Sequence, residues 1–506
     1  MSHTENILKM LPDRTGAGRN SQIYTPAPIV REMLDILPED VWNSHTTFLD
    51  PCCKSGIFLH EIYLKLMETE SLVTEFPDKA ERREHILQNQ LYGIALNPMC
   101  QLMSVRTVYG TIQGESNIIL IDNYTDKVKR ELIGSIKGVL NNMRFNVVIG
   151  NPPYSDTTSR GEIGSGNALY PYFMNLAKQL GERHCLVIPS GWMVQYPTGT
   201  RHWIVDNFRK SKHIIELHDF ENANRLFNDV SIPTGVCYYL YDNKHEVDNC
   251  IHAIVSQNGD EVIIDDQPLF NEEVGVIFRE SFIIDINSKI RAKEGTNFKS
   301  FADACAGAKH YFDDGKEIMT SVWDNYKTCK DSVHNIMYFL KTSNKVHKGN
   351  CTECGNASIP SLGYGWVSKE QIPKNVELYK KHKIIVGQAF TAGSPQVMDI
   401  PQYIGNNSVC SQSYVPIFSP HNTEEECLNI CKYIKTKFFR YLVSILKMGQ
   451  NLGNRVYALV PTLNFLDNTD IDWSQSIQDI DQQLYKKYNL TEEEIAYIEK
   501  TIKPMQ

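Results

Sequence analysis

The sequence predicts an α/β protein in which a domain built on a mostly parallel sheet is followed by an α+β domain. Short apolar runs of strand length alternate with amphipathic stretches of helical length over residues 1–240, as in successive βαβ units. This alternation stops after about residue 285. With 42% apolar and 22% charged residues in a chain of 506, the composition is that of a folded globular protein.

The first domain is predicted over residues 1–285. Its apolar runs, interpreted as strands, lie at 47–49, 91–96, 118–121, 145–149 and 184–188. Between the first two runs, apolar residues recur at helical spacing from Phe58 to Leu66. Parallel sheets bind ligands at the carboxyl ends of their strands, so the polar residues that follow these runs are the candidates for chemistry.

The second domain is predicted over residues 286–506. Residues 295–425 are irregular and rich in Asn, Gly, Ser and Lys. A strong helical pattern then covers 424–447. Thr491 and Glu494 have the spacing of a capping box, which predicts a last helix ending near residue 500.

The charge is unevenly distributed along the chain. The formal net charge is −9, yet residues 291–460 contain 21 Lys and Arg against 14 Asp and Glu, a local excess of +7. The remainder therefore carries −16. A basic block in an acidic chain fits a DNA-facing module beside a small-molecule domain, and a solvated basic surface is the alternative.

The sequence predicts neither export nor a membrane span. The apolar stretch 7–11 is followed at once by proline and charged residues, and no apolar run approaches the ~20 residues of a span. We therefore expect a cytoplasmic protein with reduced cysteines. Cys351 and Cys354 have the spacing of half a zinc site, with Cys329 and Cys410 as isolated candidates for the rest, and a polar loop is the alternative.

The strongest chemical signal is Asn151-Pro152-Pro153-Tyr154, directly after the predicted strand 145–149. An aromatic amine is a poor nucleophile because its lone pair is delocalised into the ring. The Asn151 side-chain oxygen and the Pro152 carbonyl can accept hydrogen bonds from its two protons, and the prolines remove competing donors. Tyr154 offers a ring face on which an extruded base can stack. A Pro-Pro turn that closes a strand is the alternative.

The second signal lies in residues 48–58. A predicted strand ends in Asp50-Pro51, a tight loop passes Gly56, and a helix begins near Phe58. α/β folds use this arrangement to bring a backbone close to a nucleotide-like cofactor. Asp50 could hold the ammonium group of a methionine moiety. An ordinary βα turn is the alternative.

Two weaker segments follow the same logic. They are Tyr24-Thr25-Pro26, before a helical pattern, and Asp122-Asn123, after a predicted strand. An acid at the second place can accept a hydrogen bond from an adenine amine of a cofactor. A helix cap or a turn is the alternative for each.

Together and in this order, the segments resemble the adenine-N6 DNA methyltransferases of restriction–modification systems, gamma class. That family has Y-T-P first, then D-P-x-x-G-x-G, an acidic strand end, N-P-P-Y and a C-terminal target-recognition domain. The resemblance covers nearly the whole chain. Further segments that look like the family lie at 169–173, 187–192, 226–232, 436–442 and 484–494. Lys54 departs from the pattern, because it stands where a glycine is usual.

The resemblance implies a Rossmann-like domain that transfers a methyl group from S-adenosylmethionine to the exocyclic amine of an adenine in double-stranded DNA. It implies that the base is flipped into the Asn151–Tyr154 pocket, with Phe227 as a second wall. Asn97 is the candidate for the cofactor ribose. The resemblance implies no metal, because the sulfonium already activates the methyl group. A cognate restriction endonuclease is a further expected partner, and no oligomer is required.

The helical pattern at 424–447 suggests where DNA binds. Its apolar stripe is predicted to pack inward, and Lys432, Arg440 and Lys447 are predicted to project from the opposite side. With Arg455 in the polar stretch that follows, these side chains are expected to contact the DNA backbone.

Other classes of function remain as alternatives. N-P-P-Y also occurs in enzymes that methylate a glutamine amide in protein, although these are shorter and have no large basic C-terminal half. A DNA-binding protein with an inactive methylase fold is a second alternative, against which the intact Asn151–Tyr154 motif argues. A fused nuclease would need an N-terminal domain, and the cofactor segment already begins at Tyr24.

Overall fold

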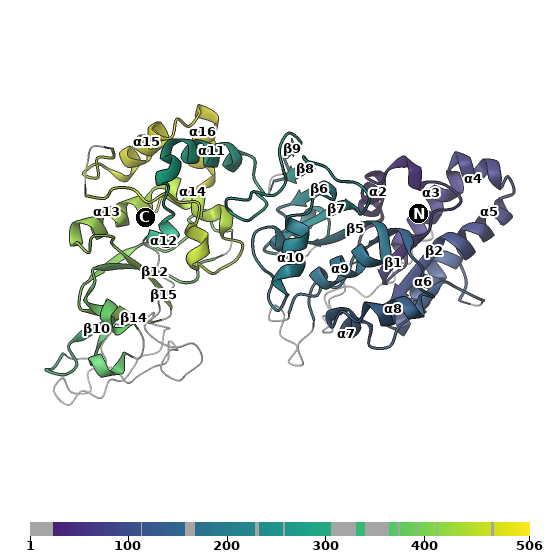
Figure 1. Ribbon diagram of the computed structural model, residues 1–506, viewed down its shortest axis with the longest axis horizontal. Helices are drawn as coiled ribbons and strands as arrows, with labels where there is room; N and C mark the ends of the chain where they lie inside the picture. Colours follow the sequence, from purple (N-terminus) through teal and green to yellow (C-terminus); the bar gives the residue numbers. More distant parts are fainter. Residues whose placement is uncertain are drawn as a thin grey trace. The chain divides into compact units, whose positions relative to one another are not determined.

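The computed structural model describes most of the chain in two compact units, Met1–Arg279 and Glu280–Gln506 (Figure 1). The described residues are 24–112, 114–156, 167–227, 232–256, 259–304, 330–339, 364–372, 375–391, 393–411, 413–466 and 470–505. The division falls at Arg279, a few residues before the expected boundary at 285.

In the described part of the first unit, nine strands form one sheet in the order β3-β2-β1-β4-β5-β7-β6-β8-β9. They are β1 (Phe48–Cys53), β2 (Leu91–Ala95), β3 (Ile118–Leu120), β4 (Phe145–Gly150), β5 (Gly181–Pro189), β6 (Ile214–Phe220), β7 (Val236–Asp242), β8 (Ile251–Val255) and β9 (Glu261–Ile264). Of these described strands, only β7 and β9 run against the others. The prediction of a mostly parallel sheet is confirmed.

Helices cover both faces of this sheet. They are α2 (Ala27–Asp35), α3 (Ile57–Glu68), α4 (Glu70–Glu75), α5 (Lys79–His85), α6 (Pro98–Tyr109), α7 (Tyr124–Lys129), α8 (Ile133–Val139), α9 (Tyr170–Leu180) and α10 (His202–Arg209), with short turns η2 (Glu39–Val41), η3 (Ile86–Gln90), η4 (Ser190–Met193) and η5 (Ala223–Arg225). Helix α3 packs against α2 and α6, whereas α9 packs against α7, α8 and α10. The chain leaves β1 and β4 in opposite directions across the sheet, so right-handed crossovers put α3 and α9 on opposite faces.

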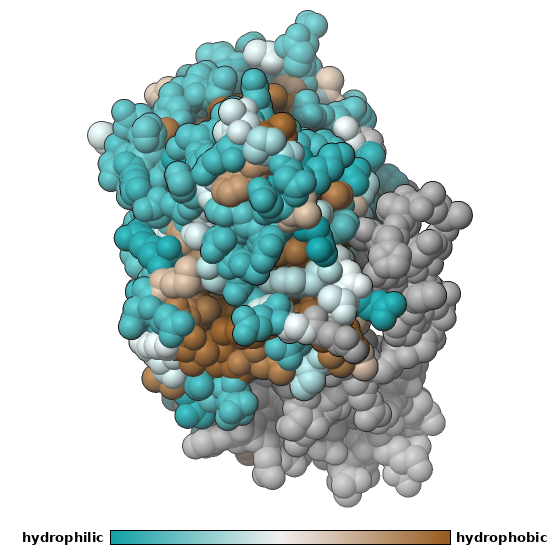
Figure 2. All heavy atoms as spheres, turned by 90° about the vertical axis from the view of Figure 1, so that its right-hand side faces the viewer, coloured by the Kyte–Doolittle hydropathy of each residue, from teal (hydrophilic) through white to brown (hydrophobic). Residues whose placement is uncertain are grey.

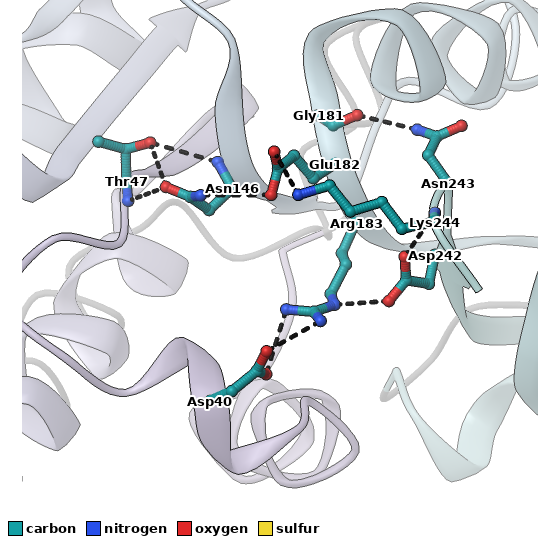
Figure 3. A network of polar contacts seen from close by, with 9 residues as sticks. All are labelled: Asp40, Thr47, Asn146, Gly181, Glu182, Arg183, Asp242, Asn243 and Lys244. Carbon is teal, nitrogen blue, oxygen red and sulfur yellow. Dashed lines mark hydrogen bonds and ion pairs between the residues drawn. The ribbon is translucent and has the colours of Figure 1, made fainter.

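A polar network ties the strands together at the edge of the sheet where β1, β4 and β5 begin (Figure 3). The Asn146 side-chain oxygen accepts from the Thr47 N–H at 2.9 Å. Arg183 donates to Asp242 at 2.7 Å and to both carboxylate oxygens of Asp40 at 3.1 and 3.0 Å. Glu182 pairs with the amine of Lys244 at 2.8 Å. We call this set the amino-edge network.

The second unit contains two small sheets and a group of helices. Within its described residues, the sheets have the orders β11-β10-β14 and β13-β12-β15. The strands are β10 (Ile336–Phe339), β11 (Tyr364–Val367), β12 (Lys383–Gly387), β13 (Gln402–Gly405), β14 (Ser408–Cys410) and β15 (Tyr414–Phe418). The helices are α11 (Phe282–Glu294), α12 (Phe301–Ala304), α13 (Glu424–Lys435), α14 (Lys437–Leu446), α15 (Ile477–Lys487) and α16 (Glu492–Thr501), with turns η6 (Gly295–Asn297), η7 (Lys369–Gln371), η8 (Val376–Lys380) and η9 (Asn454–Tyr457).

The prediction of one helix over 424–447 is wrong, because the chain breaks at Thr436. Thr436 has extended backbone angles (φ −63°, ψ 152°), and its side chain accepts from the Phe439 N–H at 3.2 Å as the N-cap of α14. The first N–H groups of α14, from Lys437 and Phe438, donate to the carboxylate of Asp481 at 2.9 Å each. The first N–H groups of α14 therefore have hydrogen-bond acceptors, so a second helix can begin here in place of one continuous helix. The capping box of Thr491 and Glu494 at α16 is present as predicted.

Candidate active site

The strand order reverses between β1 and β4, which pair in parallel at the centre of the sheet. The chain goes from β1 toward β2 and β3 on one side, and from β4 toward β5 on the other. The crevice outside the carboxyl ends at such a switch point is where open α/β sheets bind ligands. Asp50 is the third of the six residues of β1, directly before the register shift toward its carboxyl end, and Asn151 directly follows β4. The two strongest sequence signals therefore meet at this point.

The loop from β1 to α3 can form only with glycine at position 56. Gly56 has φ +80° and precedes the first residue of α3. A Cβ there would lie 2.8 Å from Cα of Ser104. A Cβ at Gly150 would lie 2.7 Å from Oδ1 of Asp50, so the end of β4 also approaches this carboxylate closely. Gly56 thus lets the loop after β1 pack against α6, and Gly150 lets the end of β4 approach the Asp50 carboxylate.

Asp50 is a buried acid, with 2% of its surface exposed. Its Oδ1 accepts from the Cys52 N–H at 2.9 Å. Burial raises the pKa of Asp50 to about 6, and burial lowers the pKa of the neighbouring Lys54 to about 8. The carbonyl of Pro51 accepts from the Tyr124 hydroxyl at 2.8 Å, which fixes the loop. A carboxylate held out of water in this way gains from a cationic ligand that neutralises it.

Asn151 is buried, and its side chain is oriented by a residue 126 positions earlier in the chain. Its Nδ2 donates to Oγ1 of Thr25 at 3.0 Å. Thr25 is itself buried and directly precedes Pro26, the N-cap of α2. Because this bond uses the donor end of the amide, it fixes which end is the acceptor. Thr25, predicted as a cofactor residue, is thus seen holding Asn151.

Tyr154 has its hydroxyl inside the unit and part of the residue exposed. The residue is half-buried, but its hydroxyl is fully buried and has no hydrogen-bond partner among the described residues. Burial raises the pKa of this hydroxyl well above its usual value. The Leu169 N–H donates to the Tyr154 carbonyl at 3.0 Å, which anchors the backbone. A ring held in this orientation can act through its face.

Phe58, a candidate for cofactor binding, and Phe227, the expected second wall of the base pocket, are both buried in the apolar core. Phe58 is 3% exposed and Phe227 1%. Both belong to the core cluster that includes residues of α2, α3 and the central strands. Phe227 is held by its N–H, which donates to the carbonyl of Ala223 at 2.9 Å.

The other predicted cofactor residues differ in what they do. Asn97 caps α6, because its side-chain oxygen accepts from the Cys100 N–H at 2.9 Å. That oxygen is engaged within the chain. Asp122 and Asn123 are exposed after β3, and Asn123 has φ +53° at the start of α7. Tyr24 is half-buried, and burial raises its pKa.

Two exposed apolar residues at the carboxyl edge of the sheet were not predicted from the sequence. Met99, in the first turn of α6, is 65% exposed, and Leu120, the last residue of β3, is 37% exposed. Leu120 is the register partner of Ala95, which ends β2 four residues before Met99. Figure 2, which views the molecule from the right-hand side of Figure 1, shows a mostly hydrophilic surface with an apolar area in its lower half. The signal available in the sequence was an apolar residue at the end of one strand and another four residues after the end of a second.

The structure corrects the predicted basic face of the second unit. Arg440 is fully buried, and its guanidinium donates to the carbonyls of Thr436, Gln396 and Lys503 at 3.1, 3.2 and 2.6 Å. Those carbonyls need donors, so this arginine serves the core of the unit and is not a phosphate ligand.

The other three basic residues that were expected to contact DNA differ in how exposed their side chains are. Lys432 is half-buried, and its amine donates to the carbonyl of Trp473. Lys447 is also half-buried and donates to the carbonyl of Thr391 at 3.0 Å. Arg455 is exposed in η9, where it was expected.

Neither a metal cluster nor a membrane helix is seen in the described ranges. No group of three or more His, Cys, Asp or Glu there could hold a metal ion. Cys410 is buried in β14, whereas Cys329, Cys351 and Cys354 lie outside the described residues. No described helix is both long enough and apolar enough to cross a bilayer.

The first unit overlaps a known family in sequence. Residues 89–227 match the family model described as Eco57I restriction-modification methylase. This range runs from β2 to Phe227 and includes the Asn151–Tyr154 motif. An uncharacterized adenine-specific methylase of Mycoplasma pneumoniae is 25% identical over 366 residues, and the alignment covers 58% of this chain and 85% of that protein.

Solved structures of restriction–modification enzymes are similar at low identity. The methyltransferase subunit of a type I system from Streptococcus thermophilus gives a TM-score of 0.33 at 14% identity, over 49% of this chain and 50% of that one. The Type IIL enzyme MmeI in complex with DNA gives 0.45 at 13% identity, over 98% of this chain and 77% of that one. The chain thus spans half the length of the first of these structures. The family match, together with the strand order and the order of the motifs, identifies a methyltransferase domain of the restriction–modification type in this chain.

Proposed function

We propose that this protein transfers a methyl group from S-adenosylmethionine to the exocyclic amine of adenine in double-stranded DNA. The observation that carries the proposal is the buried Asn151 at the switch point of the sheet, with its amide nitrogen held by Thr25 at 3.0 Å. An acceptor of fixed orientation at the carboxyl end of β4 meets the need of an aromatic amine for a hydrogen-bond acceptor.

The chain's own residues prepare the amine. The Asn151 side-chain oxygen and the Pro152 carbonyl accept hydrogen bonds from the two N–H groups of the amine. These bonds localise the lone pair on nitrogen. When bound, S-adenosylmethionine supplies an electrophilic methyl group on a sulfonium. The nitrogen lone pair would form the new N–C bond as the S–C bond breaks, and the electron pair of the S–C bond would stay on sulfur. The nitrogen then loses one proton through these acceptors to water.

The cofactor would bind across the carboxyl ends of β1, β2 and β3. Asp50 would hold its ammonium group, because a buried carboxylate gains most from a neutralising cation. Gly56, which has no Cβ, lets the loop that would lie beside the cofactor pack against Ser104. The exposed side chains of Met99 and Leu120 would pack against the adenine ring. In this assignment, the bound adenine ring would cover the two apolar side chains that are otherwise exposed.

The target adenine would leave the duplex and enter beside Asn151. Tyr154 would stack on it, which is consistent with a partly exposed ring and a buried hydroxyl. Phe227 is proposed as the opposite wall and would have to expose its face when the base enters, because it is 1% exposed here. The second unit would select the DNA sequence, and a cognate restriction endonuclease and a cytoplasmic location are proposed with it.

A decisive experiment is expression in a host that lacks DNA adenine methylation, followed by long-read sequencing of its DNA. The expected result is methylated adenine at one recurring sequence, lost in Asn151→Ala. In parallel, purified protein is incubated with labelled S-adenosylmethionine and either that DNA or a protein carrying a methylatable glutamine. Label in the protein and not in the DNA would overturn the proposal in favour of a glutamine methyltransferase.

A further inference from the structure

Arg279, the last residue of the first unit, forms a buried ion pair that the proposed reaction does not yet use. Its Nε donates to Oδ2 of Asp219 at 2.5 Å, and its Nη2 donates to Oδ1 at 2.7 Å. Its Nη1 donates to the carbonyl of Thr234 at 2.7 Å. The Asp219 side chain is 0% exposed and that of Arg279 11%. Two bonds to one carboxylate and one to a carbonyl fix the plane of the guanidinium.

This ion pair lies at the edge of the sheet where the active site is. Strand β6 is antiparallel to β7, which is antiparallel to β5, so β6 ends at the same edge as β4 and β5. Asp219 is the penultimate residue of β6, and Ser190 directly follows β5. The Ser190 hydroxyl donates to Oδ1 of Asp219 at 2.6 Å. Through Asp219, Arg279 therefore ties together the end of β5, which lies beside β4, and the end of β6, which lies beyond β7.

The chain that leads to Phe227 leaves β6 just after this carboxylate. From Asp219 the chain leaves β6, makes the turn η5, and reaches Phe227 eight residues later. On the other side, the Ser190 N–H donates to the carbonyl of Gly235 at 3.1 Å. Gly235 has φ +68°, and a Cβ there would lie 2.9 Å from Nη2 of Arg279. The backbone is thus fitted closely around the guanidinium.

The position of Arg279 in the chain adds a second observation. The next residue, Glu280, opens the second unit and is anchored within it. One of its carboxylate oxygens accepts from the Phe282 N–H at 2.9 Å, and the other accepts from the Tyr441 hydroxyl. Two consecutive residues are therefore held by their side chains, each in its own unit.

We infer that Arg279 is a positioning residue for the target base, which rests on the proposed function. Through Asp219 it sets the Ser190 turn and the η5 segment that carries Phe227, one wall of the base pocket. It touches neither the reacting amine nor the cofactor loop at Asp50. Its loss should therefore impair the placement of the base and leave cofactor binding unchanged.

The test compares Arg279→Met and Arg279→Lys with a matched control, Arg183→Met. Arg183 also pairs with carboxylates in the first unit, at 2.7 Å from Asp242 and 3.0 Å from Asp40, but at the amino edge. All variants are assayed below their unfolding temperatures. The measurements are kcat, KM for DNA carrying the sequence found methylated in the host, the affinity for S-adenosylmethionine, and the emission of a fluorescent purine placed at the target position.

Arg279→Met should lower kcat/KM for DNA by about 10²-fold, the order of loss caused by a misplacement of about 1 Å. The fluorescence rise on binding, which reports the unstacked base, should fall with it. Arg279→Lys should recover part of both, because it keeps a cation on Asp219. Arg183→Met should lower the unfolding temperature and leave kcat, KM and fluorescence unchanged.

Two results would overturn the inference. One is Arg279→Met with wild-type kcat/KM and fluorescence while the protein is folded, which would make the ion pair purely structural. The other is an equal loss in Arg183→Met. If the wild-type protein methylates DNA, either result leaves the proposed function intact. If the wild-type protein methylates no DNA, the proposed function itself is rejected.

Discussion

The two edges of the central sheet are built from the same strands and differ in how their polar groups are satisfied. At the amino edge, Arg183 has carboxylate partners for its guanidinium, and Asn146 accepts from Thr47 (Figure 3). At the carboxyl edge, Asp50 is buried with a pKa of about 6, and Tyr154 has a buried hydroxyl without a partner among the described residues. The amino edge satisfies its polar groups within the chain, whereas the carboxyl edge holds a buried acid, Asp50, that a cationic ligand would neutralise.

This difference separates stability from function within one layer of structure. Buried polar groups are normally paired, because an unpaired one costs free energy. Where they are left to the ligand, the cost is accepted for binding or chemistry. Substitutions at the amino edge should therefore change the free energy of unfolding, and substitutions at the carboxyl edge should change kinetics. The following predictions test that separation, beginning with the largest effect.

Asn151→Ala should reduce methyl transfer by about 10²–10³-fold, the usual loss for one preorganised hydrogen-bonding group at a reacting atom. Cofactor affinity by calorimetry should stay near that of the wild type, because the lost acceptor faces the amine. Thr25→Val keeps the shape of the side chain and removes the hydroxyl that holds Asn151, so a smaller loss of kcat is expected. Wild-type turnover in Asn151→Ala would remove this residue from the mechanism.

Tyr154→Ala should weaken binding of the flipped base by about 1–3 kcal/mol, the value of one stacked base. Tyr154→Phe should behave like the wild type, because the hydroxyl it removes has no described partner. The measurement is KM for DNA together with kcat for both variants. Equal losses in the two would show that the hydroxyl acts in the reaction.

Arg183→Met should lower the free energy of unfolding by about 2 kcal/mol, the value of hydrogen bonds between charged groups at a partly buried site. Urea unfolding of the whole protein, read by a probe in the first unit, measures it. The kinetic constants should not move. A large fall in kcat with unchanged stability would contradict the separation of the two edges.

Cofactor binding should depend on pH through Asp50. Burial raises its pKa from 3.8 to about 6, so the carboxylate that would hold the ammonium group forms only as pH rises through about 6. Affinity should fall about tenfold for each pH unit below this value and level off above it. Asp50→Asn should bind weakly and lose the pH dependence, which calorimetry from pH 5 to pH 8 would reveal.

The same shift has the opposite sign for stability in the protein without cofactor. The folded state holds the Asp50 proton more tightly than the unfolded state does. This contribution to stability is fully present below pH 3.8 and is lost as pH rises through about 6. Unfolding of Asp50→Asn should lack this component across the same window.

Arg455→Ala should give the smallest effect, a decrease of about 0.9 in the log–log salt dependence of DNA binding, which is the value for one phosphate that is no longer neutralised. Arg440→Ala is the comparison, because its guanidinium is buried among carbonyls. It should destabilise the second unit and leave the salt slope of the folded fraction unchanged. An unaltered slope in Arg455→Ala would place its side chain away from DNA.

The parts that sequence predicted are those that depend on local pattern. Strand ends, the loop at Gly56 and the position of Asn151 after β4 follow from apolar runs and the polar residues beside them. The Thr491 cap follows from spacing alone. Such features are set by a few neighbouring residues, so the sequence displays them directly.

The parts that were missed depend on partners distant in the chain. Arg440 is buried by carbonyls at Gln396 and Lys503, and the helix breaks at Thr436 because Asp481 receives its first N–H groups. Helical periodicity describes one element and cannot show which other element covers its charged side. The bond from Thr25 to Asn151, across 126 positions, was invisible for the same reason.

The adjacent anchors of Arg279 and Glu280 have a consequence for engineering. A hybrid enzyme that joins the first unit of one relative to the second unit of another should be cut at this peptide bond. Each parent then contributes the anchored residue together with its own anchor, Asp219 on one side and Tyr441 on the other. A crossover a few residues later would leave a foreign Phe282 N–H or Tyr441 to meet Glu280. The proposed role of the second unit in selecting the DNA sequence would then be tested by exchanging it as a module, with the junction chosen by side-chain chemistry.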